Sequence, residues 1–166
     1  MNAVHVVSVT MLLIVGVFAA SAHAEPMKEL AAYRNGLGKW TCDAKEIGSG
    51  KAFKATAEFS AELDGNTYIE RYVEIANSER PNPWKGIFIM SYDPQSQRWV
   101  RNGVDNSGMR NAATSSGWHD NIWVWENDYL NIVINQIGTQ ARTVAIDVKD
   151  ATTGVKRVVE ATCRRM

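Results

Sequence analysis

The feature that most constrains the fold is a succession of about ten strand-like segments, joined by short turns, that fills the chain from Gly38 onward. The clearest is residues 51–63, in which apolar and polar side chains alternate from Phe53 to Leu63. Because successive side chains of a strand point to opposite faces, this alternation predicts a strand with one buried and one solvated face. The other predicted strands cover residues 38–46, 67–76, 84–93, 98–108, 110–118, 122–127, 129–138, 141–150 and 155–165.

Consecutive strands joined by short turns predict an antiparallel meander. A meander this long exposes two edges unless it closes on itself, and closure removes both edges. We therefore expect an all-β fold, an antiparallel up-and-down β-barrel of about 8–10 strands. A two-sheet sandwich is the alternative. A short helix over residues 27–37 is expected before the barrel, because Leu30, Tyr33 and Leu37 recur at helical spacing.

The N-terminus carries an apolar run over residues 6–20, which is short for a membrane span. Ala22 and Ala24 then match the small-residue pattern of a cleavage site. We therefore predict a signal peptide over residues 1–24, a single β-barrel domain over residues 25–166, and a periplasmic or secreted protein with no membrane span after cleavage. No Lys or Arg precedes the apolar run, so a retained anchor is the alternative. Glu25 after the cut disfavours a lipoprotein.

The chain has two cysteines, Cys42 and Cys163, one near each end of the predicted barrel. Export favours a disulfide between them, with two unpaired buried thiols as the alternative. In an antiparallel barrel with an even number of strands the first and last strands meet antiparallel. If Cys42 then lies opposite Cys163, Trp40 lies opposite Arg165. We expect that guanidinium (or that of Arg164, if the register bulges) to stack on the indole.

Four short motifs carry a family resemblance: Gly38-Lys39-Trp40, Glu70-Arg71-Tyr72, Gly86 with Tyr92-Asp93, and Gly103-Val104-Asp105 with Gly108. Together with a basic residue late in the last strand, they resemble the calycin superfamily of lipocalins and their relatives. The closest resemblance is to a bacterial, secreted lipocalin-like family of unknown function. It implies a closed barrel with a cavity, and no established reaction. Gly103 stands where that family usually has tryptophan, so we expect extra space in the pocket there.

The turn around Asp64 and Gly65 decides which side chains of the next strand face inward. A two- or four-residue turn places Tyr68, Glu70, Tyr72 and Glu74 inside, whereas a three-residue turn places Ile69, Arg71, Val73 and Ile75 there. The first arrangement is favoured because it keeps the Tyr72 of the family-like motif inside. In the alternative, Glu70 and Glu74 are solvated surface charges.

Aromatic residues are concentrated between Trp84 and Trp125, where they either line a pocket or pack the core. Arg101 and Asp105 share one strand face and could pair with each other, inside the barrel or on its surface. The candidate ligand-binding residues are Tyr68, Glu70, Tyr72, Phe88, Tyr92, Trp99, Arg101 and Asp105, and the structural residues are Trp40, Arg165, Cys42 and Cys163.

Composition and motifs reduce the number of functional classes that fit the sequence. The 18 basic and 18 acidic residues balance, so no net field would attract nucleic acid. The sequence predicts no metal site, no cofactor and no catalytic residue, so an enzyme is not the favoured interpretation. We expect a barrel that binds a small, largely apolar molecule. The alternatives are an envelope protein–protein interaction module with a filled barrel, and an acid–base enzyme that uses Glu70 with Tyr72. The oligomeric state is not predicted.

Overall fold

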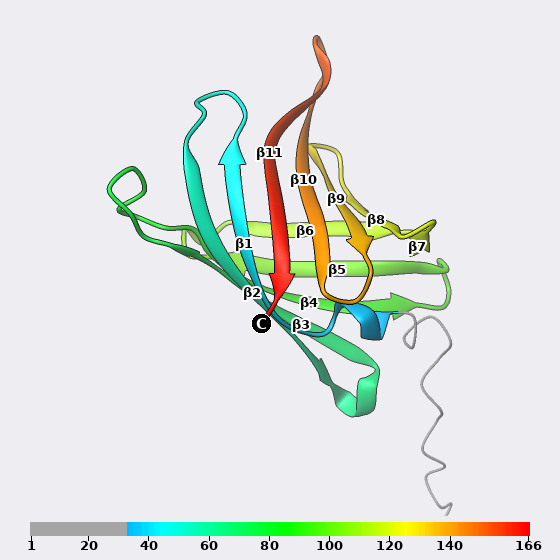
Figure 1. The fold of residues 1–166 in the computed structure, drawn as a ribbon. Coiled ribbons are helices and arrows are strands. Elements are labelled where there is room, and N and C mark those ends of the chain that lie inside the picture. Colours follow the sequence, from blue (N-terminus) through cyan, green and yellow to red (C-terminus); the bar gives the residue numbers. More distant parts are fainter. Residues whose placement is uncertain (1–32) are drawn as a thin grey trace, which may run out of the picture.

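A computed structural model describes residues 33–166, and these residues form an all-β, closed antiparallel barrel (Figure 1). A 3-10 helix, η1, precedes the strands, and a second one, η2, joins β2 to β3. The elements are η1 (Tyr33–Gly36), β1 (Gly38–Glu46), β2 (Ala52–Glu62), η2 (Leu63–Gly65), β3 (Thr67–Ile75), β4 (Lys85–Asp93), β5 (Arg98–Asp105), β6 (Arg110–Ser115), β7 (Trp118–His119), β8 (Ile122–Glu126), β9 (Leu130–Ile137), β10 (Ala141–Asp150) and β11 (Gly154–Arg165).

The strands follow the predicted meander, each antiparallel to its neighbours. One sheet runs in the order β6-β5-β4-β3-β2-β1-β11-β10-β9-β8-β7, and a pairing between β6 and β8 closes it. β7 has only two residues, so ten strands form the wall. The barrel expectation is therefore confirmed and the sandwich is excluded. The front strands β1, β2, β10 and β11 cross those of the opposite wall steeply in Figure 1, as in a strongly tilted barrel.

The alternation in residues 51–63 sets the inward face of β2. Phe53, Ala55, Ala57 and Phe59 are buried, while the intervening residues are exposed or half-buried. The buried pattern ends at Phe59, because Ala61 is exposed and Leu63 lies in the connection to β3, where it is 73% exposed. Glu62 pairs with Thr67, so a four-residue connection joins β2 to β3. This is the favoured turn length, and Tyr68, Glu70, Tyr72 and Glu74 face the interior.

The first and last strands form the predicted seam. Cys42 lies opposite Cys163 and is bonded to it, and Trp40 lies opposite Arg165. The guanidinium carbon of Arg165 lies 5.2 Å from the centre of a Trp40 ring, as expected. The Arg165 Nη2 donates to the carbonyls of Asn35 and Leu37. Gly38 adopts a φ of +102°, a conformation that glycine tolerates best, and this explains the glycine before Lys39-Trp40.

Aromatic side chains plug the barrel end that carries η1. Tyr33 of η1 is 2% exposed, and its ring lies 4.8 Å from that of Tyr68, 5.3 Å from Trp99 and 5.1 Å from Trp123. Trp40 belongs to the same cluster and donates from Nε1 to the Gly36 carbonyl at 3.0 Å. This end is therefore filled by side chains, and any interior space must lie toward the other end.

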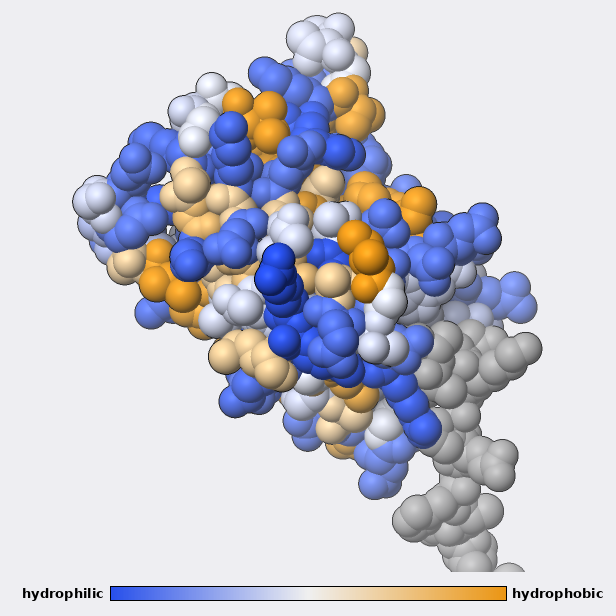
Figure 2. All heavy atoms as spheres, in the orientation of Figure 1, coloured by the Kyte–Doolittle hydropathy of each residue, from blue (hydrophilic) through white to orange (hydrophobic). Residues whose placement is uncertain are grey.

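The N-terminal predictions are described only in part. Residues 33–36 of the predicted helix form η1, and the rest of that helix before Tyr33, like the predicted signal peptide over residues 1–24, lies outside the described residues. No helix among residues 33–166 has the length and apolar character needed to cross a membrane. Figure 2 shows mostly hydrophilic residues on the face drawn in Figure 1, with apolar residues in separate spots.

Candidate functional site: a polar-lined cavity inside the barrel

A cavity of about 420 Å³ occupies the barrel interior beyond the aromatic plug. One wall is aliphatic and comes mainly from β9 and β10, through Ile132, Ile134, Val144 and Ile146. The opposite wall is polar and comes mainly from β3 and β5. Six charged side chains line the cavity as a whole: Glu46, Glu70, Glu74, Arg80, Arg101 and Arg142. Such an apolar space with a few placed polar groups is typical of a small-molecule site.

Glu70 and Arg101 form an ion pair on the polar wall. The Arg101 Nε and Nη2 both donate to the Glu70 Oε2, at 3.1 and 2.9 Å. The Arg101 guanidinium also lies 3.4 Å above the centre of the Phe88 ring, which is completely buried. Arg101 thus faces inward, as one of the two alternatives held, but its partner is Glu70 rather than Asp105.

Arg142 of β10 is a second buried guanidinium at this level. It is 4% exposed, and its carbon lies 4.2 Å from the centre of a Trp40 ring and 4.7 Å from that of Phe59. Its Nε is buried without a hydrogen-bond partner. Burial lowers the pKa of Arg142, and the negative charge of Glu70 partly offsets this. Within residues 33–166 no carboxylate forms an ion pair with it.

At the far end of the cavity, one arginine is paired with two glutamates. Arg80, in the loop between β3 and β4, donates through Nη1 to both Glu74 oxygens at 2.9 and 3.0 Å, and through Nη2 to Glu46. Its guanidinium also lies 4.0 Å from the centre of the Phe53 ring. Glu74 accepts a further bond from the Trp84 backbone N–H at 3.0 Å. Burial raises the pKa of Glu74, and this N–H bond lowers it in part.

Tyr72 and Trp84 form the side of the cavity near this rim. Their ring centres lie 5.1 Å apart. The Trp84 Nε1 donates to the Asp105 Oδ2 at 3.0 Å, and Ser107 also donates to Asp105, so these bonds hold the pKa of Asp105 below its usual range. Burial raises the pKa of Tyr72, and the charges of Glu74 and Glu70 raise it further. Tyr72 therefore remains a neutral phenol, whose hydroxyl can donate a hydrogen bond but neither accepts nor releases a proton readily at neutral pH.

The eight predicted ligand-binding residues divide between the cavity and its supports. Glu70, Tyr72 and Arg101 line the cavity. Tyr68, Tyr92 and Trp99 belong to the aromatic plug, Phe88 lies under Arg101, and Asp105 orients Trp84. Sequence reasoning did not select Arg142, Arg80 or the aliphatic residues of β9 and β10 as lining residues.

Gly103 does not open space in the pocket, contrary to expectation. A Cβ at this position would lie 2.2 Å from Cδ1 of Phe88 and 2.4 Å from the carbonyl oxygen of Ile87. Gly103 is paired directly with Phe88 across β4 and β5, and the Phe88 ring covers it. The missing side chain is thus replaced by the ring that supports Arg101.

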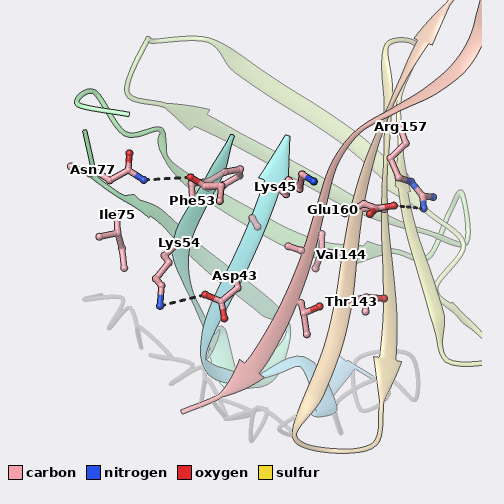
Figure 3. Close-up of a pocket in the computed structure, with 16 residues that line it drawn as sticks. Asp43, Lys45, Phe53, Lys54, Ile75, Asn77, Thr143, Val144, Arg157 and Glu160 are labelled. Carbon is pink, nitrogen blue, oxygen red and sulfur yellow. Dashed lines mark hydrogen bonds and ion pairs between the residues drawn. The ribbon is translucent and has the colours of Figure 1, made fainter. Parts of the chain in front are cut away.

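A second hollow, of about 820 Å³, runs over the outside of β2, β1, β11 and β10 (Figure 3). Four of its five charged residues form pairs, Lys54 with Asp43 at 3.5 Å and Arg157 with Glu160 at 3.4 Å, whereas Lys45 forms no ion pair among residues 33–166. Exposed pairs of this kind contribute little energy, and the one unpaired charge, on Lys45, is exposed to solvent. The interior cavity is therefore the stronger candidate site.

Comparison with known proteins adds no functional assignment. No family model matches the sequence, and no curated protein matches it. A solved structure of a redesigned β-barrel is 10% identical with a TM-score of 0.48, covering 81% of this chain and 95% of that one. A de novo designed fluorescence-activating β-barrel is 14% identical with a TM-score of 0.47, covering 81% and 97%.

Proposed function

We propose that this chain is a lipocalin-like binding protein, exported to the periplasm or the cell exterior, that holds a small, largely apolar molecule inside its barrel. The observation that carries this proposal is the cavity of about 420 Å³, enclosed by an aliphatic wall and a few polar groups. An envelope interaction module was expected to have a filled barrel, whereas side chains among the described residues fill only the end near η1.

Two further observations support the export and family parts of the proposal. A disulfide across the seam suits an oxidising compartment and agrees with the predicted signal peptide. The contact between Trp40 and Arg165 joins two of the features on which the lipocalin resemblance rests, the tryptophan of the first motif and the basic residue late in the last strand. The site favours binding over acid–base catalysis, because Glu70 is held by Arg101 and Tyr72 is a poor proton donor at neutral pH.

Native mass spectrometry of the protein purified from its own compartment tests the proposal. We expect a reproducible small-molecule adduct that is lost in Val144→Phe, because Val144 lines the cavity and a larger ring would occupy the ligand's space. Thr143→Phe is the matched control, since the adjacent side chain lies on the opposite face of β10. An unaltered protein without adduct, or equal adducts in both variants, would contradict the proposal.

A further inference from the structure

The charges that line the cavity are unevenly distributed. Near the plug, two guanidinium groups, Arg101 and Arg142, accompany one carboxylate, Glu70, which pairs with Arg101 alone. At the rim, one guanidinium, Arg80, pairs with two carboxylates, Glu46 and Glu74. The six charges cancel overall, but the inner group carries one excess positive charge and the rim group one excess negative charge. The two groups lie at opposite ends, because Arg142 contacts Trp40 near the start of β1 and Glu46 ends that strand.

The excess positive charge belongs to Arg142. Both bonds of the Arg101 fork go to Glu70, and this pair is therefore complete. Arg142 has ring contacts with Trp40 and Phe59, but within residues 33–166 no oxygen accepts a hydrogen bond from its guanidinium. A buried guanidinium without an anion is costly, because it loses hydration and gains no charged partner in return. Arginine also retains its charge in proteins, so it cannot avoid the cost by losing its proton.

We infer that the molecule bound in the cavity is a monocarboxylate with an apolar body, and that its carboxylate pairs with Arg142. The inference rests on the proposed binding function. A carboxylate matches the planar fork of arginine and supplies the single negative charge that the inner group lacks. The apolar body then lies along Ile132, Ile134 and Val144, between Arg142 and the rim. Glu70 does not compete for Arg142, because Arg101 already holds it.

The negative rim gives the site a direction. A carboxylate that stopped there would meet Glu46 and Glu74, whose shared partner Arg80 is already engaged by both. Repulsion at the rim and attraction at Arg142 favour the bound orientation in which the acid head lies at the inner end. A molecule with a cationic head is excluded from the inner end by the same charge distribution.

Matched probes that differ only in the head group test the inference. Isothermal titration calorimetry would compare decanoate with decanol and decylamine, and 2-naphthoate with 2-naphthylmethanol. We expect each acid to bind at least about tenfold more tightly than its alcohol, the ratio that one charge-assisted hydrogen bond supplies. The amine should bind more weakly than the alcohol.

Variants locate that preference. Arg142→Met should abolish the acid-to-alcohol ratio, Arg142→Lys should retain part of it, and Arg165→Met should leave it unchanged, because Arg165 stacks on Trp40 but does not line the cavity. Arg142→Met should also leave the urea midpoint of the ligand-free protein unchanged or raised, since it removes an unpaired buried charge. If Arg142 acted only by stacking on Trp40, this substitution would lower the midpoint and leave the ratio intact, which would overturn the inference.

The remaining outcomes separate this inference from the proposed function. If acids and alcohols bind equally and Val144→Phe abolishes the binding of both, the inference of a carboxylate ligand is wrong, but the proposed binding function stands. Failure of every probe to bind would count against both. If Arg142→Met does not fold, a crystal structure of the unaltered protein with decanoate replaces this test. We expect the carboxylate within hydrogen-bonding distance of the Arg142 guanidinium, and any other position would show that the inference is wrong.

Discussion

Removing the seam disulfide should cost a large share of the folding free energy. The bond joins residues 121 positions apart, so it closes almost the whole barrel into one loop. In the chain-entropy model, a loop of that length restricts the unfolded chain by about 5 kcal/mol at 25 °C. A domain of this size is stable by about 5–15 kcal/mol, so Cys42→Ala/Cys163→Ala should lose roughly a third of its stability or more. The hydrogen bonds of the β1–β11 ladder remain in the double variant, so its native state should resemble that of the unaltered protein.

Urea unfolding of the oxidised protein, the reduced protein and the double variant measures this loss. Reduction and double substitution should lower the free energy of unfolding by similar amounts, and either single substitution should cost about as much as both, because each breaks the same bond. A loss below about 1 kcal/mol would refute the reasoning, since it would mean that the bond hardly restricts the unfolded chain.

Three further predictions concern packing, pairing and pH. Gly103→Ala should lower the melting temperature sharply, because the new Cβ meets Phe88 and the Ile87 carbonyl; an unchanged melting temperature would contradict this packing. Glu70→Gln should lower the free energy of urea unfolding by about 3–5 kcal/mol, because it leaves the Arg101 charge buried and unpaired, and a neutral result would show that this pair is not buried as described. Asp150 accepts hydrogen bonds from the Thr152 hydroxyl and from backbone N–H groups, which lower its pKa below the unfolded value of about 3.9. Asp150 therefore stabilises the fold above that pH, and this stabilisation is lost as the pH falls through the folded pKa. The difference in unfolding free energy between the unaltered protein and Asp150→Asn should shrink below about pH 4, and a difference that stays constant with pH would contradict this linkage.

The barrel was predictable because local patterns and covalent constraints agree. Alternation marks the inward face of β2, and the family-like Tyr72 favours the turn length that continues it into β3. The two cysteines define the register of β1 and β11, so the contact between Trp40 and Arg165 follows from arithmetic. The strand pair that closes the other side of the barrel, β6 with β8, was not predictable. The β6–β8 pairing joins only Thr114 to Glu126, and a single pair leaves no pattern in the sequence.

The cavity was only partly predictable, because it depends on how side chains from distant strands fill the space. Tyr68 and Trp99 look like pocket residues until Tyr33 of η1 packs against both. Arg142 was missed because a charged side chain is rarely buried without a partner, although it shares a strand face with Val144 and Ile146. Its pairing opposite Cys163, an inward residue, could have revealed it once the β10–β11 register was known.

The most direct test of the central claim is a crystal structure of the protein purified from its own compartment, with no ligand added. The account predicts electron density for one small molecule in the cavity, with its acidic end at Arg142 and its apolar part along Ile132 and Val144. A cavity closed by side chains, or one that holds only water, would contradict it.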